Sequence, residues 1–102
     1  MTTHGFPAGS LESAIIDDAT ETVFGIANAR LRGNEDDAAA VLTDYIRNTL
    51  ARGVTDNRAW SLLFAAAVGQ FTELLDHRAA EHNRSADEDL QALSLEHARR
   101  RG

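Results

Sequence analysis

One segment of the sequence decides the fold: residues 55–83 have the sequence TDNRAWSLLFAAAVGQFTELLDHRAAEHN. Apolar side chains recur in this segment at intervals of three and four residues, which is the spacing of one face of an α-helix. They are Trp60, Leu63, Phe64, Ala67, Phe71, Leu74 and Leu75. Thr55 is a helix-capping residue type, and Asp56 after it suits the positive N-terminal end of a helix. We therefore expect a helix over residues 56–83, with this face in the centre of the core.

The opposite side of the same helix carries a second set of apolar residues, most of them small. They are Leu62, Ala65, Ala66 and Gly69. Small side chains let the axis of another helix come close. The segment thus has two faces on which a helix can pack, and we expect the small-residue face to be left for a partner.

Outside this segment, capping residues mark three more helices. A Ser or Asn that can accept a hydrogen bond from the first turn precedes each periodic stretch. Ser85 is followed three residues later by Glu88, which is the pattern of a capping box. The caps at Ser10, Asn34 and Ser85 predict helices over about 11–32, 35–52 and 86–100.

The short connections between these helices favour antiparallel neighbours. We predict an all-α fold, a single-domain four-helix bundle of antiparallel helical hairpins formed by residues 10–102. Residues 1–9 contain Gly5, Pro7 and Gly9 and lack periodicity, so we expect a flexible N-terminal arm there. Two hairpins stacked as in a repeat solenoid are the alternative, although such arrays normally need more repeats than two hairpins supply.

The composition excludes several kinds of chemistry. The chain of 102 residues has no cysteine, which rules out disulfides, thiolate metal ligands and thiol catalysis. Its net charge of −6 argues against nucleic acid as a partner, because nucleic-acid binding needs a basic surface. No apolar run approaches the roughly 20 residues of a membrane span, and the start of the chain lacks the features of a signal peptide. We expect a cytoplasmic protein that does not contact membranes.

One group of side chains has the residue types of a metal site. His77 has Glu73 four residues before it and Glu81 four residues after it, so the three share one helix face. The Glu-x-x-His pairs of di-iron bundles and the His-Glu-x-x-His zinc signature are both absent. We interpret this ladder as a solvated face with local ion pairs, and we predict neither a metal nor a cofactor.

An acidic cluster on the helix predicted over 11–32 is the main candidate for acid–base catalysis. It consists of Asp17, Asp18 and Glu21, which belong to the polar side of that helix. Paired carboxylates do acid–base work when burial separates their pKa values, and a polar helix face stays in water. No serine lies in a Gly-x-Ser-x-Gly motif, and a core of this size rarely forms a catalytic pocket. We predict no catalytic residues and no enzymatic activity.

The apolar surface of the predicted helices exceeds what four short helices can cover among themselves. The helix over 11–32 is apolar around about half of its circumference, more than the roughly 100° stripe of a surface helix. Uncovered apolar patches on soluble proteins mark association sites, and two-fold homodimers are the commonest closed assembly. We therefore predict a non-catalytic interaction module, an adaptor, small regulator or accessory subunit, that binds a second copy or another helical protein. The candidate interaction residues are Leu62, Ala65, Ala66, Gly69, Ile16, Phe24 and Leu31.

The alternative function is a DNA-binding transcriptional regulator. The second and third helices, with the turn at Gly53, have the order of a helix-turn-helix corner. Its contacts to nucleic acid would come from Arg47, Arg52, Asn57 and Arg58. Against this alternative, a DNA-reading helix needs an exposed polar face, whereas the third helix is the most apolar segment of the chain.

Overall fold

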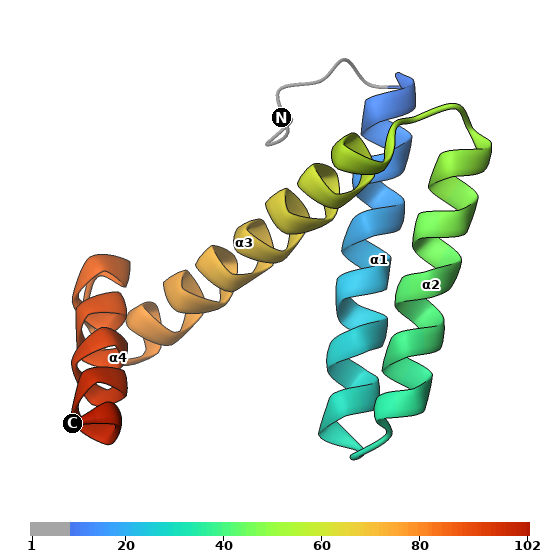
Figure 1. The fold of residues 1–102 in the computed structure, drawn as a ribbon. Helices are drawn as coiled ribbons and strands as arrows, with labels where there is room; N and C mark the ends of the chain where they lie inside the picture. The colour runs from blue at the N-terminus through green and yellow to red at the C-terminus, as the bar shows by residue number, and fades with distance from the viewer. Residues whose placement is uncertain (1–8) are drawn as a thin grey trace. The chain divides into compact units, whose positions relative to one another are not determined.

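The structure, a computed structural model, describes residues 9–102. This part of the chain is all-α, with four helices and no strands (Figure 1). The helices are α1 (Leu11–Leu31), α2 (Glu35–Ala51), α3 (Asp56–Glu81) and α4 (Ala86–Arg101). The predicted fold class is confirmed, and all four helices begin at the predicted residue. The predicted N-terminal arm lies outside the described residues except for Gly9.

Side-chain caps explain why the helices begin where the sequence predicts. The Ser10 hydroxyl and the Asn34 side-chain oxygen each accept a hydrogen bond from a first-turn N–H, both at 3.1 Å. At the start of α4 the Ser85 hydroxyl accepts from the Glu88 N–H at 3.2 Å, and the Glu88 carboxylate accepts from the Ser85 N–H at 2.8 Å. The capping box is thereby confirmed. Each cap satisfies backbone donors that have no partner inside their own helix.

A residue in the left-handed backbone conformation, with positive φ, follows each of the first three helices. Gly33 and Gly53 follow α1 and α2 with φ of 73° and 87°. Asn83, with φ of 55°, does the same after α3. Asparagine tolerates this region better than most side chains, and the turn lets the N–H of Arg84 donate to the carbonyl of Ala79 at 2.8 Å. The helix therefore stops two residues earlier than predicted, at Glu81.

The chain divides into two compact units, which we call unit one (Met1–Ala67) and unit two (Val68–Gly102). Helix α3 contributes its first part to unit one and its second part to unit two. Each unit is described by itself below. The prediction that residues 10–102 form one domain stays a prediction.

Unit one is built on α1 and α2, which lie side by side and run in opposite directions (Figure 1). The two helices come close at Gly25, where an added Cβ would lie 3.2 Å from a methyl carbon of Val41. The start of α3 packs against this hairpin. The core consists of Ile15, Ile16, Ala19, Tyr45, Ala59, Leu62, Leu63 and Ala66.

The prediction of which face of α3 packs into the core is wrong for unit one. Its contribution to the core of unit one comes mainly from the small-residue side, through Ala59, Leu62 and Ala66, with Leu63 at the margin. The largest residues of the face expected in the core are exposed: Trp60, Phe64, Phe71 and Leu74. Both faces are apolar, and the small one lets α3 lie closer to its neighbours, which gives the denser packing.

Unit two, all of which the structure describes, buries few side chains. They are Leu75, Ala79 and Asp89. In α4 the side chains of Leu90 and Leu95 are exposed. None of the helices in residues 9–102 combines the length and the apolarity needed to cross a membrane.

Candidate functional site

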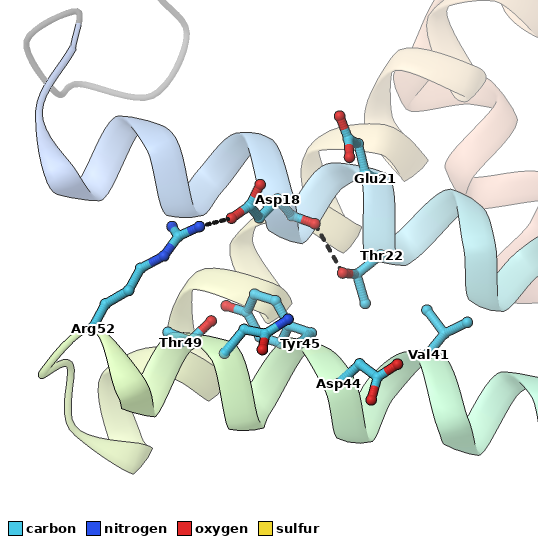
Figure 2. Close-up of a pocket in the computed structure, with 9 residues that line it drawn as sticks. Asp18, Glu21, Thr22, Val41, Asp44, Tyr45, Thr49 and Arg52 are labelled. Carbon is cyan, nitrogen blue, oxygen red and sulfur yellow. Dashed lines mark hydrogen bonds and ion pairs between the residues drawn. The ribbon is translucent and has the colours of Figure 1, made fainter.

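A polar pocket opens between α1 and α2 in unit one (Figure 2). Its volume is about 460 Å³. It is lined by Asp18, Glu21, Thr22, Val41, Asp44, Tyr45, Asn48, Thr49 and Arg52. Sequence analysis did not predict a pocket here. The one available signal was that polar residues of α1 and α2 occupy positions facing each other across an antiparallel hairpin.

Buried hydroxyl groups form the inner part of this pocket. The Thr22 hydroxyl donates to the backbone carbonyl of Asp18 at 2.8 Å, and the Tyr45 hydroxyl donates to that of Ala59 at 2.7 Å. Burial raises the pKa of Tyr45 above its ordinary 10.0, a hydrogen bond with Thr49 partly offsets this, and the charge of Asp18 raises the pKa further. Tyr45 therefore keeps its proton at neutral pH, and it serves as a hydrogen-bond donor rather than as a base.

Charged side chains form the outer part of the pocket. Asp18 of α1 and Arg52 at the end of α2 reach across to each other at 2.6 Å, as Figure 2 shows. Asp44 pairs with Arg47 at 3.3 Å, and Glu21 points away from α2 (Figure 2). With more carboxylates than guanidinium groups, the lining favours cations over anions. Two of the three carboxylates in the lining, those of Asp18 and Asp44, are each paired with an arginine.

Two groups of side chains from the sequence analysis, the acidic cluster of α1 and the His77 ladder of α3, are not arranged as metal sites. Asp17 is exposed, while Asp18 turns toward Arg52. His77, Glu73 and Glu81 are exposed on α3 in unit two. Within residues 9–102 no group of three or more His, Asp or Glu side chains is arranged to hold a metal ion.

A second hollow in unit one is apolar and lies between α2 and the start of α3. Its volume is about 410 Å³. It is lined by Leu42, Thr43, Ile46, Arg47, Leu50 and Trp60. Trp60 keeps 45% of its surface exposed, and Phe64, one helical turn further along α3, keeps 71%. Leu42 and Ile46 are half-buried against the core of unit one, and Leu50 is exposed. The four-residue spacing of these three apolar α2 residues was visible in the sequence, but nothing there showed that they line a hollow.

The seven predicted interaction residues differ in their exposure to solvent. Three of them, Ile16, Leu62 and Ala66, are buried in the core of unit one and are closed to a partner in this fold. The other four are exposed: Phe24 and Leu31 on α1, Ala65 on the first part of α3, and Gly69 in unit two. Binding of a partner at these four stays a prediction.

The residues of the DNA-binding alternative are all exposed in unit one. Arg47 and Arg52 lie on α2 and at its end, and Asn57 and Arg58 lie in the first turn of α3. Arg47 and Arg52 are paired with Asp44 and Asp18, which lowers the positive potential that a phosphate backbone would meet. DNA binding stays a prediction.

Comparisons with models of known protein families, with curated proteins and with solved structures find no match for this chain.

Proposed function

We propose that this chain is a non-catalytic protein–protein interaction module and that its partner is a second copy of the same chain. The surface used is the groove surface, which we define as Leu42, Ile46, Leu50, Trp60 and Phe64. The observation that carries the proposal is the exposure of Trp60 and Phe64 next to an apolar groove. The cytoplasmic location expected from the sequence belongs to the same proposal.

The shape and chemistry of the groove surface suit a helix. Apolar side chains held in water are unfavourable, and covering them is the main driving force of association. A groove between two helices accepts the apolar face of a third helix, whose side chains project at intervals of three and four residues. Trp60 and Phe64 are themselves spaced in that way, so the groove surface contains both a hollow and the projecting side chains that could fill the same hollow in another copy.

The distribution of charge favours a second copy as the partner. Chains with a net charge of −6 repel each other, so they associate best where charge is absent or balanced. Residues 59–67 of α3 contain no charged side chain. At the rim of the groove, Arg47 lies beside Asp44, and both are mostly exposed. In a two-fold contact Arg47 of one copy can pair with Asp44 of the other, which makes this surface complementary to itself.

Sedimentation equilibrium of the full chain between about 1 and 100 µM tests the proposal, because weak but specific interfaces dissociate in that range. We expect a mass that rises with concentration toward twice the 11.1 kDa of one chain. Phe64→Glu, which puts a charge into the groove surface, should weaken the dimer by at least about tenfold.

Phe24→Glu is the matched control, because Phe24 is also an exposed phenylalanine on a helix of unit one but is not part of the groove surface. It should leave the dissociation constant unchanged. A wild-type chain that stays monomeric at every concentration contradicts self-association. If Phe24→Glu weakens the dimer as much as Phe64→Glu, the interface lies elsewhere than on the groove surface.

A further inference from the structure

Unit two contains one fully buried carboxylate, that of Asp89 in the first turns of α4. A carboxylate removed from water is strongly destabilised unless opposite charges or hydrogen bonds compensate it. The neighbouring acids Asp87 and Glu88 are exposed, as expected at the start of a helix. The burial of Asp89 therefore needs a specific compensation.

Two arginines supply this compensation. One Asp89 oxygen lies 2.5 Å from an Arg84 Nη, and the other lies 3.5 Å from the Arg78 Nε. Neither oxygen accepts a hydrogen bond of good geometry from the described part of the chain, so the attraction is mainly ionic. Arg78 belongs to α3 and Asp89 to α4, and the ion cluster therefore ties the two helices together.

The apolar contribution to the same contact is small. In unit two, which the structure describes completely, the buried apolar side chains are Leu75 and Ala79. On α4 the side chain of Leu93 is half-buried, and those of Leu90 and Leu95 are exposed. Buried apolar area is what usually holds one helix against another. Here the attachment of α4 depends instead on three charged groups.

We propose that Arg78, Asp89 and Arg84 form an electrostatic latch that holds α4 against α3, and that α4 separates from α3 when this latch is broken, while unit one stays folded. Opening returns the Asp89 carboxylate to water. The Arg78 and Arg84 side chains are already 47% and 39% exposed, so their solvation changes little. Opening therefore loses ion pairs but regains hydration, which makes it easier than opening an apolar core. The separated state uncovers Leu75 and Ala79 on α3.

Hydrogen–deuterium exchange of the full chain, followed by mass spectrometry, tests the latch. Asp89→Asn removes the buried charge and keeps the size of the side chain. Because the two arginines are partly in water, we expect the amides of α4 to exchange about tenfold faster than in the wild type. The amides of α1 and α2 should exchange at the wild-type rate.

Asp87→Asn is the matched control, since it removes an exposed charge from the same turn of α4 and therefore the same favourable interaction with the helix dipole. It should change the exchange of α4 by less than about twofold. Arg84→Gln leaves the buried carboxylate with Arg78 alone and should also accelerate the exchange of α4. If Asp89→Asn behaves like Asp87→Asn, there is no latch. If Asp89→Asn accelerates exchange in α1 and α2 as much as in α4, α4 does not open on its own, and the proposal is overturned.

Discussion

Unit one and unit two share helix α3, but a different kind of interaction stabilises each unit internally. In unit one α3 contributes alanines and leucines to a core that also includes Ile15 and Tyr45. In unit two the same helix contributes Leu75 and Ala79, and its contact with α4 includes the ion pair between Arg78 and Asp89. One continuous helix can thus take part in an apolar core at one end and in a charged contact at the other. The stability of the two contacts should respond differently to the truncation of a side chain, to pH and to salt concentration.

The largest expected effect is the loss of apolar packing in unit one. Ile15 is fully buried in the core, and Ile15→Ala should lower the free energy of unfolding by about 2–5 kcal/mol. Urea denaturation followed by circular dichroism measures this change. Leu90→Ala in α4, whose side chain is 43% exposed, is the comparison and should have a much smaller effect. If both variants lost the same free energy of unfolding, the claim that apolar packing matters more in unit one than in unit two would be wrong.

A smaller effect is expected from the buried hydroxyl of Tyr45. Tyr45→Phe removes the 2.7 Å hydrogen bond to the Ala59 carbonyl, which links α2 to α3, and should lower the free energy of unfolding by about 1 kcal/mol.

The same residue gives unit one a dependence on alkaline pH. The pKa of Tyr45 is raised by burial, so the folded state holds the proton more tightly than the unfolded state. Stability is then unaffected below pH 10.0 and decreases as the pH rises above it toward the folded-state pKa. Denaturation curves recorded across this range should show the decrease in the wild type. Tyr45→Phe should lack this part of the pH dependence, and a Tyr45→Phe variant with the full wild-type decrease would exclude Tyr45 as its source.

The smallest expected effect belongs to the cap of α4 in unit two. The hydrogen bond from the Ser85 backbone N–H lowers the pKa of the Glu88 carboxyl, so the folded state favours the ionised form. The stabilisation is complete above the ordinary pKa of 4.5 and is lost as the pH falls through the folded-state value. The protection of the first α4 amides, meaning their exchange rate relative to an unfolded chain at the same pH, should therefore decrease in acid. Glu88→Gln, which can also complete a capping box, should not show this loss of protection.

The sequence alone indicates where each helix begins. Ser10, Asn34, Thr55 and Ser85 precede the four helices, and each acts on N–H groups within three residues of itself. Such local hydrogen bonds do not depend on the rest of the fold, so sequence reasoning can find them. The end of α3 is less clear in the sequence, because asparagine continues a helix in one context and takes the left-handed conformation in another.

Only the tertiary structure decided which helix faces pack against each other. Helix α3 has two apolar faces, and periodicity does not indicate which of them meets α1 and α2. The choice depends on how closely helix axes can approach, and therefore on Ala59 and Ala66 facing a particular neighbour. Asp89 is likewise one of three successive acidic residues in the sequence, and only the positions of Arg78 and Arg84 in space allow it to be buried. Capping is a local interaction, whereas burial depends on residues that are distant along the chain.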